Sequence, residues 1–140
     1  MPGPMTAAYS IPVRVYYEDT DAAGVVYHAN YLKYMERCRS DWLRAAGCDV
    51  ERVRARFGIL FTVRRATIDY LSPARLCDEL SVTLLILKLG KVTLDLEQSV
   101  HRGEALLCKA VLRLASLEPG SLKPKIMPDQ LLELVDRPTT

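Results

Sequence analysis

One long amphipathic helix, followed by a series of strand patterns, constrains the fold of this chain more than any other feature. Apolar residues recur between residues 30 and 46 at spacings of four, three, four and three: Tyr31, Met35, Cys38, Trp42 and Ala45. From residue 59 to 117 the pattern changes to alternation with period two, which is typical of half-buried strands. The sequence therefore predicts an α+β fold in which a bent antiparallel sheet wraps around one long central helix.

The segment 59–71 contains a change of phase within its alternation. Its apolar residues first occupy odd positions and then even ones: Ile59, Phe61 and Val63, followed by Ala66, Ile68 and Tyr70. Because side chains alternate across a strand with period two, this switch predicts one extra residue near Arg64–Arg65. We expect a β-bulge there that bends the strand.

The remaining elements follow from similar patterns. Alternation predicts a first strand over 11–17, and Gly47 and Gly58 mark the ends of the long helix and of a short second helix over 49–56. Short connections at 71–78, at 89–91 and at Gly103 predict that consecutive strands are antiparallel neighbours. We expect a flexible leader over 1–10, one domain over 11–128, and a tail over 129–140 with a possible short helix.

Composition excludes several classes of function. The 140 residues carry 19 basic and 17 acidic side chains, a net charge of +2, which is too balanced for a nucleic-acid-binding surface. The four cysteines lie far apart without metal-ligand spacing, so we expect neither a metal nor another cofactor. The start of the chain does not resemble a signal peptide, and no apolar run reaches the ~18–20 residues that span a bilayer. These features predict a reduced, cytoplasmic protein without membrane insertion.

The chemistry is expected in the loop that precedes the long helix. Glu18, Asp19 and Asp21 place three carboxyl groups within four residues, and His28 stands where the helix begins. The first N–H groups of a helix have no internal acceptor and favour negative charge, so they can hold an oxyanion. Gly24 would let the backbone approach a ligand closely. On pattern alone, this segment fits either half of a hydrolase site or a solvated turn.

The segment VRVYYEDTDAAGVVYHANYLKYMERCRSDWLRAAG, residues 13–47, resembles the signature of the 4-hydroxybenzoyl-CoA thioesterase group of hotdog-fold proteins. It looks most similar to the bacterial Tol-Pal-associated acyl-CoA thioesterases, and segments 65–80 and 117–128 are also similar to that family. The resemblance implies a hotdog fold and hydrolysis of acyl-CoA to a free acid and CoA. It also implies that Asp21 is the catalytic carboxylate and that a backbone N–H near His28 holds the oxyanion, with Tyr27 matching beside it.

Other polar residues have weaker assignments. The His28 imidazole has either a catalytic role or a capping role, whereas we expect structural roles for Glu18 and Asp19 and a helix-capping role for Asn30. The phosphates of CoA need basic groups at the rim of the site. Four residues are candidates, each with an alternative reading as an ordinary surface charge: Arg64, Arg65, Lys88 and Lys91.

Several alternatives remain open at this point. Asp21 can act as a general base or as a nucleophile. A rival function is a non-catalytic module that binds acyl-CoA or acyl carrier protein in envelope-lipid metabolism; acyl dehydration would need another acid–base arrangement. Exposed strand edges and the small size of the chain predict a homodimer or a tetramer of dimers, with pockets lined by both subunits. The length of the acyl chain cannot be predicted from the sequence.

Overall fold

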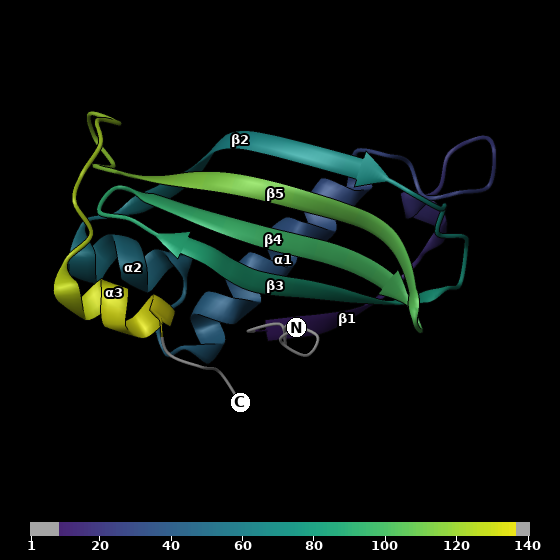
Figure 1. Ribbon diagram of the computed structural model, residues 1–140, viewed down its shortest axis with the longest axis horizontal. Coiled ribbons are helices and arrows are strands. Elements are labelled where there is room, and N and C mark those ends of the chain that lie inside the picture. The colour runs from purple at the N-terminus through teal and green to yellow at the C-terminus, as the bar shows by residue number, and fades with distance from the viewer. Residues whose placement is uncertain (1–8, 137–140) are drawn as a thin grey trace, which may run out of the picture.

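The computed structural model describes residues 9–136, in which five strands form one antiparallel sheet in the order β1-β3-β4-β5-β2 (Figure 1). The strands are β1 (Tyr9–Arg14), β2 (Leu60–Tyr70), β3 (Glu79–Leu89), β4 (Thr93–Arg102) and β5 (Ala105–Leu117). The long helix α1 (Asn30–Ala45) crosses one face of this sheet, behind the strands in Figure 1. This arrangement confirms the predicted α+β architecture.

Helix α1 buries four of the five residues that its periodicity predicts; the fifth, Ala45, is exposed, because the core face of the last turn is formed by Trp42 and Leu43. Tyr34, Met35, Cys38 and Trp42 are each at most 2% exposed and belong to the core between α1 and the sheet. The helix ends as expected at Gly47, whose φ of +98° is a conformation that glycine adopts readily. Gly47 thus ends α1 where the sequence predicts.

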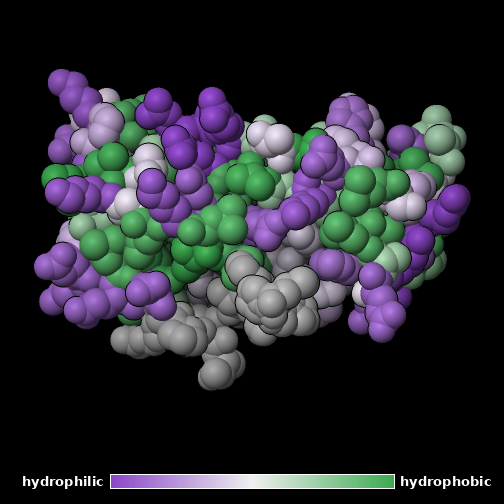
Figure 2. Space-filling model, viewed as in Figure 1, coloured by the Kyte–Doolittle hydropathy of each residue, from purple (hydrophilic) through white to green (hydrophobic). Residues whose placement is uncertain are grey.

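The opposite face of the sheet is a mixture of polar and apolar surface (Figure 2). Ion pairs bridge neighbouring strands there, between Arg113 and Asp95 at 2.8 Å and between Lys109 and Glu97 at 2.7 Å. The sheet is therefore one-sided, with the helix on its core face and charged side chains on its outer face, as the alternation predicts.

The predicted bulge in β2 is confirmed by a shift in the pairing of β2 with β5 between Val63 and Arg65. On both sides of the bulge the apolar residues of β2 face the core side of the sheet, beside the buried Leu112 and Leu114 of β5. Val63 and Tyr70 are nevertheless 44% and 49% exposed. Helix α1 packs mainly against β1 and β3 and leaves β2 uncovered.

One predicted pairing is wrong. The short link 71–78 was expected to make its two strands neighbours, but β2 pairs with β5 and β3 lies between β1 and β4. Eight residues in extended conformation span up to about 26 Å, which is enough to cross beneath the intervening strands, each about 4.8 Å wide. Backbone hydrogen bonds attach the link to neighbouring segments, from Leu71 N to Leu107 O and from Cys77 N to Val15 O. The predicted pairings of β3 with β4 and of β4 with β5 are confirmed.

The first strand is shifted from its predicted range. It was expected over 11–17, but β1 starts at Tyr9 and stops at Arg14, so the expected leader 1–10 overlaps it and otherwise lies outside the described residues. A 3₁₀ turn at Tyr17–Asp19 follows, in which the Asp19 carboxylate accepts a hydrogen bond from Tyr16 N at 2.8 Å. This side-chain bond turns the chain away from the sheet before Tyr17 can continue the strand.

The helices α2 (Val50–Phe57) and α3 (Asp129–Asp136) agree with expectation. Asp49 accepts a hydrogen bond from Arg52 N at the start of α2, and Gly58 ends that helix with a φ of +62°. Lys125 donates from Nζ to the carbonyl oxygens of Phe57 and Gly58, which anchors the C-terminal tail to α2. Within residues 9–136 no helix is long and apolar enough to cross a membrane.

Candidate active site

The loop before α1 holds Asp21 in a tight turn. Gly24 N donates to Asp21 O at 3.0 Å, and Gly24 has a φ of +79°, which favours glycine at this position. One carboxylate oxygen of Asp21 accepts a hydrogen bond from Ala23 N at 2.9 Å. The side chain is exposed and forms no ion pair with any described residue. The turn therefore orients the carboxylate while leaving it accessible.

Helix α1 begins without the groups that usually neutralise a helix start. Its N-cap residue is Ala29, no side chain caps it, and its first turn contains no acidic residue. In the described part of the chain, the His28 backbone N–H donates no hydrogen bond. The positive end of the helix dipole and this free donor can together stabilise an oxyanion. The structure thus leaves a free backbone donor at the position where the resemblance implies one.

Asn30 joins this helix start to the carboxylate loop. It was expected to cap α1, but its buried side chain instead donates from Nδ2 to Asp19 O at 2.8 Å. The same carbonyl accepts from Tyr27 N at 2.9 Å. Asp19 therefore serves a structural role through both its carboxylate and its backbone, as expected, and the segment carrying Asp21 is fixed relative to His28.

An aromatic cluster surrounds His28. Its ring lies 4.5 Å from that of Tyr27 and 6.2 Å, edge to face, from that of Tyr70, measured between centroids. The Tyr70 hydroxyl donates to His28 O at 3.2 Å, and the Tyr31 ring packs against Tyr70 at 5.7 Å. The end of β2 thus forms one wall beside the helix start.

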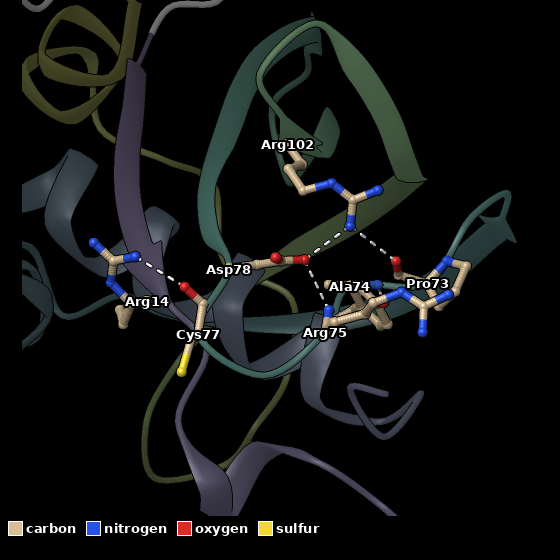
Figure 3. Close-up of polar contacts among 8 residues, drawn as sticks. Arg14, Pro73, Ala74, Arg75, Cys77, Asp78 and Arg102 are labelled. Atoms are coloured by element: carbon tan, nitrogen blue, oxygen red, sulfur yellow. Dashed lines mark hydrogen bonds and ion pairs between the residues drawn. The ribbon is translucent and has the colours of Figure 1, made fainter. Parts of the chain in front are cut away.

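The crossing segment 71–78 packs against the loop that carries Asp21 and against the start of α1. Ala74 N donates to Tyr31 OH at 3.0 Å, while Ala74 O accepts from Val26 N at 2.8 Å. Figure 3 shows how Asp78 fastens this segment, accepting from Arg102 and from Arg75 N, both at 2.8 Å. Burial acts to raise the pKa of Asp78, but these hydrogen bonds outweigh it and hold that pKa below its usual value.

The four basic candidates do not gather around Asp21 within one subunit. Lys88 and Lys91 lie at the β3–β4 hairpin, about 33 Å along β3 from the end that adjoins the loop. Arg64 and Arg65 are exposed at the bulge of the edge strand, about 17 Å along β2 from Tyr70. Only Asp21, Gly24, Tyr27 and His28 of the predicted site residues come together in a single chain.

Tyr70 and Asn30 are the site residues whose roles the sequence did not reveal. The alternation of β2 predicts only that Tyr70 is on the core side of the sheet. Its contact with His28 arises because segment 71–78 crosses the sheet and so places β2 at the edge beside the helix start. Asn30 was recognised as polar at a helix start, but its partner is a carbonyl eleven residues earlier. Neither contact has a local signal in the sequence. Among residues 9–136 no group of His, Cys, Asp and Glu is arranged to hold a metal ion.

Comparisons with known proteins identify the family of this chain. Residues 23–109 match the model of the thioesterase superfamily. The chain is 38% identical over 123 residues to the acyl-CoA thioesterase YbgC of Haemophilus influenzae, covering 88% of this chain and 90% of that protein. It is 37% identical to the acyl-CoA thioester hydrolase YbgC of Escherichia coli O6:H1, covering 91% and 95%. The crystal structure of a probable thioesterase from Bartonella henselae superposes with a TM-score of 0.81 at 33% identity, covering 86% and 98%.

Proposed function

The chain belongs to the thioesterase superfamily, with the hotdog fold, and hydrolyses acyl-CoA thioesters; from this premise we propose that Asp21 is its catalytic carboxylate and the start of α1 its oxyanion site. The observation that carries the proposal is the uncapped helix start, with the free His28 N–H, tied by Asn30 to the turn that presents Asp21. The family match favours hydrolysis over a non-catalytic binding module and over dehydration. Thiol release from a series of acyl-CoAs tests the activity, and the Asp21 variant in the Discussion tests the site.

The reaction needs two groups that this site supplies. The thioester carbonyl oxygen lies at the helix start, where the His28 N–H and the helix dipole stabilise the negative charge that develops on it. Asp21 takes a proton from water, whose oxygen attacks the carbonyl carbon. The tetrahedral intermediate then expels the CoA thiolate, which takes that proton from Asp21.

Alternatively, Asp21 attacks the carbonyl carbon itself and forms a mixed anhydride, which water then hydrolyses. A single turnover in ¹⁸O-labelled water tests the nucleophilic route. Label in the Asp21 carboxylate identifies that route, with water attacking the aspartyl carbon of the anhydride, whereas label in the free acid alone is expected both for the general base and for an anhydride opened at the substrate carbon.

The His28 side chain has a secondary role in this proposal. His28→Ala removes the imidazole but keeps the backbone N–H, so we expect only a moderate loss of kcat, about tenfold or less, compared with ~10²–10⁴ for a lost acid–base group. Steady-state thiol release measures this. A loss as deep as that of Asp21→Asn would instead make the imidazole essential.

We propose that the active unit is a homodimer, or a tetramer of such dimers, joined through β2. This edge strand is exposed over residues 63–70, apart from the partly buried Ile68. Asp21, Gly24, Tyr27 and His28 are also exposed, so one subunit does not enclose a thioester. Pairing of two β2 edges would satisfy the free backbone groups and enclose both sites.

Charges on β2 favour a particular two-fold axis. Arg65 lies directly opposite Arg113 of β5, an unfavourable pairing, and forms no ion pair with the described residues. Antiparallel pairing about Thr67, near the middle of the exposed part of β2, sets Arg65 of each subunit against Asp69 of the other. The same axis sets Arg64 of one subunit beside Tyr70 of the other. We therefore rank Arg64 and Arg65 above the lysines as groups near the CoA phosphates.

Charge reversal distinguishes the two basic pairs. Arg64→Glu should raise KM for acyl-CoA severalfold with a smaller change in kcat, because phosphate contacts stabilise the ground state and the transition state alike. The double variant Lys88→Glu/Lys91→Glu is the matched comparison and should raise KM less. A rise in KM confined to the lysine variant would place the phosphates at the β3–β4 hairpin instead.

We propose the cytoplasm as the compartment of action. Burial raises the pKa of the Cys38 thiol to about 12 and that of Cys108 to about 11, so these cysteines behave as inert core residues in a reducing environment. Acyl carrier protein is a second proposed donor, because it presents the acyl group as the same kind of thioester. Release of the carrier protein's thiol from its acylated form, measured in the same thiol assay, tests this.

A further inference from the structure

The two peptide groups that flank residue 28 are held in different ways. The preceding peptide is fixed by the backbone, because Tyr27 N donates to Asp19 O at 2.9 Å and Tyr27 O accepts from Asn30 N at 2.8 Å. The following peptide has no backbone acceptor bond. Among residues 9–136, the one donor to His28 O is the Tyr70 hydroxyl, at 3.2 Å. A side chain of β2 therefore holds the second of these peptides.

The His28 side chain is held by the same strand. In the described part of the chain, the imidazole nitrogen atoms form no hydrogen bond, and the ring is contacted by those of Tyr27 and Tyr70. The Tyr70 ring meets the imidazole edge to face, at 88° between the ring planes. Tyr70 thus contacts residue 28 twice, at its carbonyl oxygen and at its ring.

Tyr70 occupies a fixed position. It pairs with Cys108 of β5, and its ring packs against that of Tyr31 at 5.7 Å between centroids. The chain that follows is held to β5 as well, because Leu71 N and Ser72 N both donate to Leu107 O, at 2.9 Å and 3.1 Å. Tyr70 is nevertheless 49% exposed, so the hydroxyl can be removed without opening a cavity in the core.

The geometry of the turn at residues 27–30 shows what the hydroxyl prevents. The bond from Asn30 N to Tyr27 O closes this turn, and Ala29 has a φ of −69° and a ψ of −21°, as in a type I turn. A type II turn closes with the same hydrogen bond, but its central peptide, here between His28 and Ala29, is rotated by about half a turn. That rotated form needs a positive φ at Ala29, which alanine disfavours but can adopt.

Rotation of this peptide would change the charge at the helix start. Carbonyl groups in helical conformation point along the helix axis, opposite to the N–H groups. In the observed turn His28 O therefore points away from the free N–H groups, and it meets the Tyr70 hydroxyl there. In the rotated turn the same oxygen would point toward the side of those N–H groups, where its negative partial charge would repel an oxyanion.

We propose that Tyr70 is a positioning residue of the oxyanion site, whose hydroxyl keeps the carbonyl of His28 turned away from the thioester. This inference rests on the proposed placement of the oxyanion at the start of α1. The negative charge on the thioester oxygen develops in the transition state, whereas the bound thioester carries little of it. Loss of the hydroxyl should therefore lower kcat and leave KM unchanged.

Tyr70→Phe removes the hydroxyl and keeps the ring. We expect kcat for acyl-CoA hydrolysis to fall about three- to tenfold, the value of one net hydrogen bond, with KM and the melting temperature unchanged. Tyr17→Phe is the matched control, because Tyr17 is 83% exposed and its hydroxyl forms no hydrogen bond with a described residue. An unchanged kcat in Tyr70→Phe would overturn the proposal, and so would a rise in KM alone, which would make Tyr70 a substrate contact.

The position of residue 28 can be observed without turnover, because the sequence contains two histidines. Labelling with ¹⁵N-histidine gives two backbone amide signals, that of His28 and that of His101 on β4, which is separated from β2 by β5. Tyr70→Phe should shift or broaden the His28 signal and leave the His101 signal unchanged, and Tyr17→Phe should change neither. A His28 signal identical to that of the wild type would refute the positioning role, even if kcat fell.

A stable ligand separates this inference from the proposed oxyanion site. In an acetyl-CoA analogue with a methylene group in place of the thioester sulfur, a ketone oxygen occupies the position of the thioester oxygen. Its binding to the wild type should shift the His28 amide signal. A signal that stays unchanged, although calorimetry detects binding, would contradict the oxyanion site itself. A shift in the wild type, together with no effect of Tyr70→Phe on kcat or on the signal, would overturn only the role of Tyr70.

Discussion

Asp21→Asn should lower kcat for acyl-CoA hydrolysis by ~10²–10⁴-fold, the usual effect of removing a required acid–base group. Asn has nearly the same shape and can still accept the hydrogen bond from Ala23 N, so the turn that holds residue 21 is kept. It cannot take a proton from water or form an anhydride. Affinity for acyl-CoA, measured by calorimetry on the variant, should therefore change little.

Glu18→Gln is the matched control for this prediction. Glu18 lies on the same loop and is exposed, and the same loss of a carboxylate there should leave kcat close to that of the wild type. An Asp21→Asn enzyme that kept more than about a tenth of wild-type kcat would place the catalytic carboxylate elsewhere. A deep loss in Glu18→Gln would show that the charge of the loop matters, rather than one group in it.

The elements of the fold could be predicted because their signals are local. The apolar face of α1, the glycines that end both helices and the phase switch in β2 each depend on a few consecutive residues, and all three are confirmed. The position of β2 depends on a long-range choice. An eight-residue link is long enough either to pair its two strands as neighbours or to cross the end of the sheet to a more distant strand. Apolar contacts on the core face determine which of these two arrangements forms.

The candidate site likewise has a part that local sequence predicts and a part that depends on long-range contacts. Asp21, Gly24 and His28 lie within eight consecutive residues, so a motif locates them and the turn between them is local. The contacts that assemble the site join distant segments, as in the bonds of Asn30 to Asp19 and of Tyr70 to His28. The proposed role of Arg64 and Arg65 depends on contacts between subunits, because in the proposed dimer they reach the site of the partner and not that of their own chain. Sequence patterns therefore locate the candidate reactive groups, whereas the residues that surround them depend on the tertiary fold.

Arg65→Asp should weaken the proposed dimer strongly, and the double variant Arg65→Asp/Asp69→Arg should restore it. Pairing about Thr67 brings two Arg65–Asp69 contacts per dimer, and the single substitution turns both into repulsion between carboxylates. At about 1 kcal/mol for each contact, the loss is about 2 kcal/mol, which raises the dimer dissociation constant about 30-fold. Sedimentation velocity over a dilution series measures this constant.

The thermal stability of the single subunit is the control for this charge exchange. Arg65 faces Arg113 across β2 and β5, so an aspartate at position 65 relieves a like-charge contact within the chain and should not lower the melting temperature of the subunit. In the proposed dimer each site is enclosed by both subunits, so activity per subunit should fall on dilution in Arg65→Asp and recover in the double variant. A rise in KM without any change in dimerisation would instead assign Arg65 to the CoA phosphates. A fully active wild-type monomer at the lowest concentrations would exclude β2 pairing as a requirement for catalysis.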